Sequence, residues 1–289
     1  MQHWNLNGEL MSYDELPVSL FNRSVYYGDS LTEPLLVQAG YIPFWEEHYF
    51  HLMASMRKLR YQIPMSFTPE YLEEECLKLW RAVGKPAELK LAIQVMRAEV
   101  NQAWNSEGGL HFLIGIINPD SSGLVTTGEA ELYKDHYLPS GMLANLSTPA
   151  PAAVAVATSF ALENDYADLA LLNEQKQVVR SLSGLLFIGN ENELKTPELP
   201  TGAPGWVVRK QALIQLDKIT EANDWLLEEG TISPFEIPKA KEVFTMNAFG
   251  ELVSWNKYRK TVYQQFSWKE ALESAWKTAL EPQKASKEN

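Results

Sequence analysis

A run of turn-forming residues near the middle of the chain most constrains how it can fold. Residues 118–123 read Asn-Pro-Asp-Ser-Ser-Gly, and a segment this rich in turn formers favours a linker over a helix or a strand. The parts before and after it, about 120 and about 170 residues, are each long enough to bury a core. Two domains are therefore predicted, spanning residues 1–120 and 121–289, with a polar C-terminal tail after about residue 280.

The part before the linker mixes two periodicities. Apolar residues follow strand patterns in Leu31–Val37, Leu89–Ala98 and Leu110–Ile117, and the last two read as a hairpin pair. Apolar residues recur at helical spacing in Glu46–Tyr61 and again after Pro69. This mixture predicts a compact α+β domain.

The part after the linker alternates strands and helices over a longer stretch. Strand patterns begin at Leu124, Asp168, Gln177, Leu185, Glu242 and Glu251, the last two being taken as the final strands. Helical patterns cover Pro149–Asn164, Trp206–Leu216 and Trp268–Leu280. A larger α/β domain is predicted, so that the whole is an α/β-type two-domain protein with its cleft between the halves.

Composition narrows the classes of partner. The formal net charge is −12, which disfavours nucleic acid and anionic membranes because both attract clustered lysine and arginine. Cys76 is the only cysteine, so an intramolecular disulfide is impossible and a cysteine-based metal site is not expected. No apolar run reaches the length of a membrane span. A cytoplasmic protein is therefore expected, with neither nucleic acid nor membrane as a partner.

Common catalytic signatures are missing from the sequence. It contains no phosphate-binding glycine loop, no G-x-S-x-G and no H-E-x-x-H. His48 and His51 share one helical face and could bind a metal ion with Glu46 or Glu47, but a pair at the surface or at a cleft edge is favoured. No metal site is predicted.

Several short motifs occur in an order that resembles one family. Residues 21–33 read F-N-R-S-V-Y-Y-G-D-S-L-T-E, and residues 47–52 read E-H-Y-F-H-L. A-D-L-A-L-L follows at 167–172, T-P-E-L at 196–199 and A-K-E-V-F at 240–244. The set resembles class IV (fold type IV) pyridoxal-phosphate enzymes, which include branched-chain and D-amino-acid aminotransferases and 4-amino-4-deoxychorismate lyase. The resemblance implies the D-amino-acid aminotransferase-like fold, a homodimer and pyridoxal phosphate as family cofactor.

The resemblance also locates the family's Schiff-base lysine, and this chain lacks it. Counting back from the A-D-L-A-L-L segment, the lysine position falls on Thr148. The nearest lysines are Lys134 and Lys176, so an alignment shift of ten residues would not restore the amine. A threonine hydroxyl cannot form a Schiff base with the cofactor aldehyde.

Other cofactor contacts implied by the family have changed as well. The carboxylate that faces the pyridine nitrogen falls on Arg180, and the arginine that holds the phosphate falls on His51. A phosphate-binding hydroxyl falls on Val208, where the backbone amides of Val207 and Val208 remain available. The small hydroxyl residues after the late strand fall near Asn247 and Phe249. The last two cleft candidates, Glu33 and Arg97, match the family and are also explained by packing or an internal ion pair.

These changes predict a degenerate site. The favoured hypothesis is a class IV-like binding or regulatory homologue that has no cofactor, forms a homodimer and takes a small anionic ligand in the interdomain cleft. One alternative is an active class IV enzyme with an unconventional site, either a branched-chain or D-amino-acid aminotransferase or an aminodeoxychorismate lyase. Another is an unrelated reaction that uses His51, Glu33 or Arg180. Whether the protein is an enzyme stays open at this point.

Overall fold

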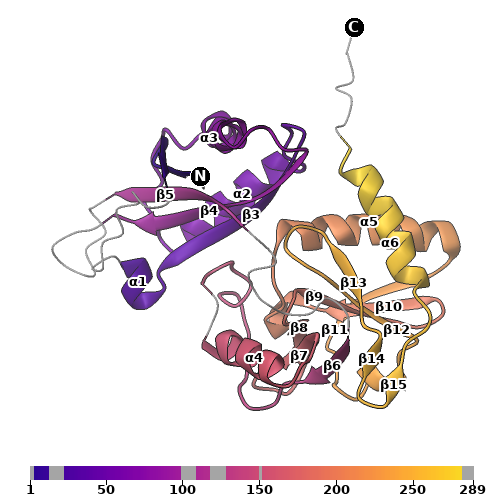
Figure 1. The fold of residues 1–289 in the computed structure, drawn as a ribbon. Helices are drawn as coiled ribbons and strands as arrows, with labels where there is room; N and C mark the ends of the chain where they lie inside the picture. The colour runs from indigo at the N-terminus through magenta and orange to yellow at the C-terminus, as the bar shows by residue number, and fades with distance from the viewer. Residues whose placement is uncertain (1–2, 13–22, 99–108, 118–127, 150–151, 282–289) are drawn as a thin grey trace, which may run out of the picture. The chain divides into compact units, whose positions relative to one another are not determined.

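A computed structural model describes residues 3–12, 23–98, 109–117, 128–149 and 152–281 of the chain (Figure 1). The chain forms two compact units, which are described separately below. Unit 1 comprises Met1–Asn118 with Lys277–Asn289, and unit 2 comprises Pro119–Trp276. The predicted linker at residues 118–123 lies outside the described ranges. None of the helices in these ranges combines the length and the apolar character that crossing a bilayer requires.

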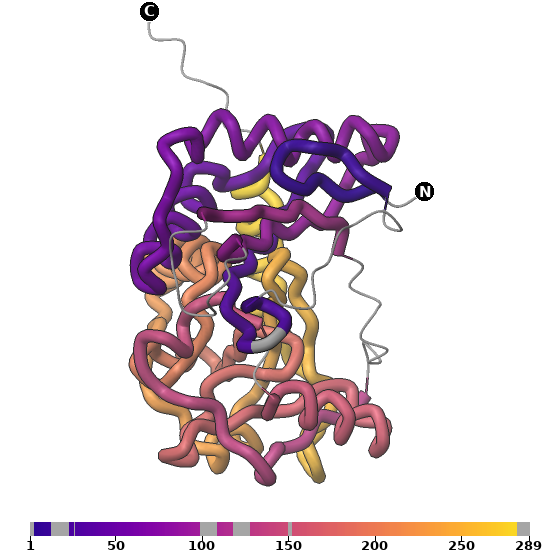
Figure 2. The backbone as a smooth tube through the Cα atoms, turned by 90° about the vertical axis from the view of Figure 1, so that its left-hand side faces the viewer, coloured from indigo at the N-terminus to yellow at the C-terminus, as the bar shows by residue number. Residues whose placement is uncertain are grey.

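Unit 1 is built on one antiparallel sheet of five strands in the order β2-β1-β5-β4-β3. Its strands are β1 (His3–Leu6), β2 (Glu9–Ser12), β3 (Ser30–Gln38), β4 (Glu88–Arg97) and β5 (Leu110–Ile116). Its helices are α1 (Arg23–Tyr27), α2 (Trp45–Lys58) and α3 (Pro69–Ala82). α2 packs on β3 and α3 packs on β1. The β1–β2 hairpin is the dark indigo loop of Figure 2.

Local sequence explains these elements. In β3 the buried side chains of Leu31, Leu35 and Val37 alternate with partly exposed ones, as a strand with one face on the core requires. α3 begins after Thr68, whose hydroxyl accepts a hydrogen bond from the Tyr71 amide at 3.2 Å, and Pro69 occupies the first turn. The helix start expected at Pro69 is therefore confirmed.

Unit 2 contains two five-stranded sheets, in the orders β11-β10-β9-β12-β13 and β15-β14-β6-β7-β8. The strands are β6 (Glu129–Leu132), β7 (Asp168–Leu172), β8 (Val178–Ser181), β9 (Leu185–Gly189), β10 (Glu193–Pro197), β11 (Leu226–Gly230), β12 (Glu242–Met246), β13 (Leu252–Ser254), β14 (Lys257–Tyr258) and β15 (Thr261–Val262). The helices are α4 (Ala152–Glu163), α5 (Val207–Asn223) and α6 (Ser267–Ala279), of which residues 267–276 belong to unit 2, with short 3-10 turns at Leu199–Thr201 and Ile237–Lys239.

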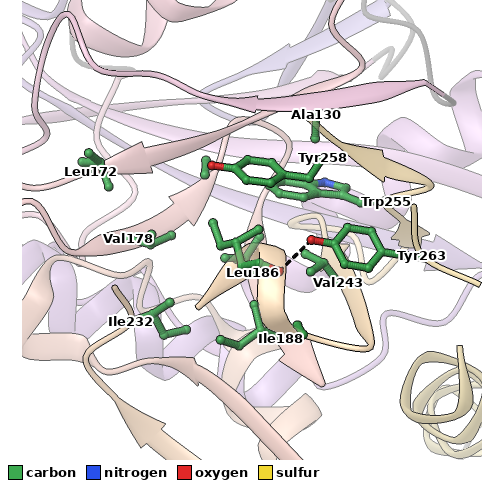
Figure 3. Packing of buried hydrophobic residues seen from close by; sticks show 13 residues of the cluster. Ala130, Leu172, Val178, Leu186, Ile188, Ile232, Val243, Trp255, Tyr258 and Tyr263 are labelled. Atoms are coloured by element: carbon green, nitrogen blue, oxygen red, sulfur yellow. Dashed lines mark hydrogen bonds between the residues drawn. The ribbon is translucent and has the colours of Figure 1, made fainter. Parts of the chain in front are cut away.

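An apolar core joins the two sheets of unit 2 (Figure 3). Val178 of β8 belongs to the same buried cluster as Leu186 of β9 and Val243 of β12. The ring of Trp255 stacks on that of Tyr258, with centroids 6.0 Å apart and planes 11° apart. The aromatic pair and the aliphatic side chains thus exclude water from both sheets together.

Three expectations about unit 2 were wrong. β10 lies where only a turn and a T-P-E-L motif were expected, and β14 and β15 follow the segment taken as the last strand. α5 continues to Asn223 rather than ending near Leu216. Strands of two residues are too short to produce an alternating pattern, and β10 carries charged residues and a proline that conceal it.

The turn after β8 makes a close backbone contact that gives a first prediction. A Cβ atom added to Gly184 would lie 2.2 Å from the backbone oxygen of Met246. We expect Gly184→Ala to lower the free energy of unfolding by about 2–3 kcal/mol, because a backbone oxygen cannot rotate away. Urea unfolding measures this loss. Gly141→Ala meets no neighbour within 4 Å but has φ of +88°, so it should cost only the backbone strain of about 1 kcal/mol. An equal or smaller loss for Gly184→Ala would contradict the assigned contact.

Candidate functional site

In unit 1, a buried carboxylate bridges two imidazoles. Glu33 on β3 lies 2.6 Å from His48 Nδ1 through Oε1 and 2.7 Å from His51 Nδ1 through Oε2. Glu33 is only 3% exposed, so both of its oxygens depend on these partners for hydrogen bonds. The two histidines lie on α2, which places them side by side above the strand.

The ionisation of Glu33 decides which atoms donate. Burial raises the pKa of this carboxyl, but the hydrogen bonds from His48 and His51 lower it by more. The resulting pKa therefore lies below the ordinary value. An ionised carboxylate only accepts, and both Nδ1 atoms must therefore carry the proton. The histidine pair is thus tied to Glu33. Within the described ranges no group of three or more His, Cys, Asp or Glu side chains could hold a metal ion.

Arg97 belongs to an internal ion pair in the same unit. Its Nε lies 3.0 Å from Asp29 Oδ2, and its guanidinium lies 4.0 Å above the Tyr61 ring. Arg97 also donates to the backbone oxygens of Leu59 and Arg60, just after the end of α2. Cations near a helix C-terminus are stabilised by the helix dipole. Arg97 therefore fastens β4 to α2.

In unit 2, Thr148, which the sequence analysis assigned to the family lysine position, lies in a well-anchored loop. Thr148 is exposed, and its amide donates to the Leu146 oxygen at 2.9 Å. Nearby, the Asn145 side-chain amide donates to the oxygens of Leu199 and Ala203 at 2.8 and 2.7 Å. The Gly205 amide donates back to the Asn145 oxygen at 3.0 Å. These contacts hold the Thr148 loop against the segment that leads into α5.

The start of α5 lacks a side-chain cap. Trp206 is its N-cap residue and makes no side-chain capping hydrogen bond. Val207 and Val208 form the first turn, and both are buried. The amides of a first turn have no acceptor inside the helix, and the helix dipole makes this end electropositive. Val207 and Val208 thus lie at a helix start, where their backbone amides have no acceptor inside the helix.

Arg180 lies beside that helix start. Its Cζ is 5.1 Å from the centre of the Trp206 ring, while Nε and Nη2 donate to the oxygens of Ser181 and Leu182 at 2.9 and 3.3 Å. Burial lowers the pKa of the guanidinium to about 10, against the opposing attraction of Asp168. Within the described ranges no carboxylate lies at ion-pair distance from Arg180. The structure thus brings together Arg180, the valines and the Thr148 loop.

The charge of Asp168 acts on Arg180. The sequence analysis did not single out Asp168 as a site residue. The buried Asp168 carboxylate accepts hydrogen bonds from the Leu169 and Ser183 amides, the Ser183 hydroxyl and the Trp255 indole. Burial nevertheless raises the pKa of Asp168. The sequence did hold a signal for this residue, namely an acid at the start of the otherwise apolar strand D-L-A-L-L. A carboxylate in a buried strand requires specific hydrogen-bond partners.

Asn247 and Phe249 lie in the turn between β12 and β13. The Asn247 side-chain oxygen accepts from the Phe249 amide at 2.9 Å, and its amide donates to Glu251 Oε2 at 2.6 Å. Phe249 is partly buried. Gly184 packs against Met246 and Asn247, so this turn lies beside the loop that follows Arg180.

The Glu33 cluster gives a pH-dependent prediction. We expect Glu33→Gln to lower the free energy of unfolding by about 3 kcal/mol at pH 7, because one imidazole N–H then loses its carboxylate acceptor. The folded-state pKa of Glu33 lies below the ordinary 4.5, so its stabilisation is complete above that pH and is lost as the pH falls below it. Urea unfolding at pH 7 and pH 4 should therefore show a smaller difference at pH 4.

Glu46→Gln is the matched control, because this exposed acid lies on the same helix. It should change the free energy of unfolding by about 0.5 kcal/mol at most. A Glu33→Gln effect that is equally small, or that does not change with pH, would contradict the assigned bridge.

Comparison with known proteins places this geometry in a family. A sequence model of the family described as Amino-transferase class IV matches residues 30–257. No curated protein sequence matches the chain. The fold is similar to the branched-chain aminotransferase of Thermoproteus uzoniensis solved with norvaline, at 20% identity and TM-score 0.80 over 96% of this chain and 95% of that one.

Two further structures agree. The branched-chain amino acid aminotransferase of Escherichia coli matches at 15% identity and TM-score 0.81, over 100% of this chain and 97% of that one. The Thermobaculum terrenum enzyme in its pyridoxal-phosphate form matches at 15% and 0.78, over 96% and 94%. At these identities the structures establish the fold alone, while the family match covers most of the sequence. The chain belongs to the class IV aminotransferase family.

Proposed function

We propose that this protein is a binding or regulatory homologue of the class IV aminotransferases that works without a Schiff base to pyridoxal phosphate. The observation that carries the proposal is the anchored loop around Thr148, the residue that the order of the sequence motifs assigns to the family lysine position. The flanking Lys134 and Lys176 are both exposed, and Lys176 lies in the turn between β7 and β8. Neither amine belongs to the loop that Asn145 holds against the start of α5.

The residues present also do not fit the rest of the family cofactor. Pyridoxal phosphate needs an amine for its aldehyde and, in this family, a carboxylate beside its pyridine nitrogen. Arg180 supplies a cation at that second position, and a cation repels a protonated pyridine ring. In unit 1, the imidazole of His51 is engaged by Glu33, and it lacks the two-pronged donor geometry of the arginine it replaces. We therefore derive no reaction step through the cofactor.

The oligomeric state and the ligand of this chain are proposed on different grounds. The resemblance implies a homodimer in the cytoplasm, and we propose the same for this chain, with light scattering of the purified protein as the test of its mass. The similar solved structures are branched-chain aminotransferases, but the low sequence identities give no reason to transfer their substrates. The proposed function is therefore the binding of a small molecule without transamination.

Reaction with pyridoxal phosphate tests the proposal. Purified protein mixed with the cofactor should develop no Schiff-base absorbance, and borohydride treatment followed by mass spectrometry should give no stoichiometric adduct. The reason is that no lysine amine lies in the loop of Thr148. A stoichiometric adduct on any lysine of the chain would contradict the proposal.

A double substitution tests whether the side chains at positions 148 and 180 are the only reason that the site does not take the cofactor. We expect Thr148→Lys with Arg180→Glu to gain a borohydride-trapped adduct on residue 148, because an amine and a carboxylate then occupy the two family positions. Thr148→Arg with Arg180→Glu is the matched control, since it adds the same charge without a reactive amine. If the double variant folds and traps no cofactor, the two positions do not face one ligand and the assignment is wrong.

A further inference from the structure

We propose that Arg180 and Trp206 form a binding site for a small carboxylate in unit 2. The inference rests on the proposed function, because it names the class of ligand that the same site would take. It starts from the contacts that the Arg180 side chain makes.

The hydrogen bonds of Arg180 leave one edge of its guanidinium available. The group has five N–H donors in a fixed plane. Nε and Nη2 use the edge nearer the backbone to reach the oxygens of Ser181 and Leu182. The opposite edge, formed by Nη1 and the second proton of Nη2, meets no acceptor among the described residues. Two parallel N–H groups at this edge match the two oxygens of a carboxylate.

The charge of the site favours an anion with a single negative charge. Arg180 has no carboxylate at ion-pair distance within the described ranges, and the Asp168 oxygens already accept hydrogen bonds from Ser183 and Trp255. Asp168 still offsets part of the guanidinium charge at longer range. A carboxylate therefore balances what remains, whereas a dianion would exceed it.

The start of α5 adds a further polar feature. This electropositive helix end begins at Trp206, whose ring lies 5.1 Å from the guanidinium. The amides of the first turn have no acceptor inside the helix, and a bound oxyanion beside Arg180 would lie near them.

The same surroundings favour a carboxylate over a phosphate. Val208 contributes no hydroxyl at the start of α5, so the extra oxygens of a phosphate would find fewer donors. Arg180 and Trp206 are both only partly buried, which leaves the guanidinium and the indole accessible to a flat apolar group attached to the carboxylate. An aromatic carboxylate is therefore the simplest probe of this site.

Calorimetric titration of the full-length protein with benzoate tests the inference. We expect saturable binding by the wild type and an affinity about tenfold or more lower in Arg180→Gln, because the variant loses a bidentate, charge-assisted contact. Arg180→Lys keeps the charge without the fork and should lose less. Lys176→Gln removes the same charge from the exposed turn of the same hairpin and should bind benzoate as the wild type does. Circular dichroism and thermal unfolding check that each variant is folded.

Two comparisons on the wild type keep the test decisive. Benzamide, the neutral analogue, should not bind, and inorganic phosphate should bind more weakly than benzoate. The inference is overturned if the wild type does not bind benzoate or if benzamide or phosphate binds with the same affinity as benzoate. It is also overturned if Arg180→Gln and Lys176→Gln bind benzoate with the same affinity. None of these results bears on reaction with pyridoxal phosphate, so the carboxylate site can fail while the proposed function stands, and the reverse.

Discussion

The carboxylate of Asp168 is the interaction on which the candidate site of unit 2 depends. It lies on a fully buried strand and receives hydrogen bonds from the turn after β8 and from Trp255, a residue far along the sequence. A buried carboxylate is costly unless its oxygens are satisfied, so the turn and the indole are held at defined positions. Ser181 at the end of β8 and Leu182 in that turn supply the two backbone oxygens that fix Arg180. The position of the guanidinium is thus set by an acid it does not touch.

Unit 1 also contains a buried carboxylate whose hydrogen bonds hold other side chains in place. Glu33 is buried and satisfied by two imidazoles from α2, which joins the helix to the sheet. In the family pattern the position of His51 belongs to a phosphate-binding arginine. In this structure His51 makes an internal contact with Glu33, which is part of the packing of unit 1. His51 and Arg180, which the order of the motifs assigns to two cofactor positions, therefore both make internal contacts within their own units.

The sequence predicted the mixed α/β fold and the family, because long periodic elements such as α2, α3 and β3 combine clear hydrophobic patterns with turn residues at their ends. It did not predict β10 or the two-residue strands β14 and β15, which exist through pairing with distant strands. The candidate positions Thr148 and Arg180 came from the spacing of motifs. Their partners did not, because the contact of Arg180 with Trp206 and the bridge from Glu33 to His48 depend on tertiary packing that spacing does not encode.

The central claim is that the site has been rebuilt for a ligand other than the family cofactor. Pyridoxamine phosphate tests this most directly, because it is recognised without any Schiff base and so is indifferent to the absence of the lysine. Calorimetric titration of the wild-type protein with pyridoxamine phosphate should give no saturable binding, because in the proposed assignment Arg180 and His51 replace the groups that would hold the pyridine nitrogen and the phosphate. Saturable binding at one site per chain would contradict the account.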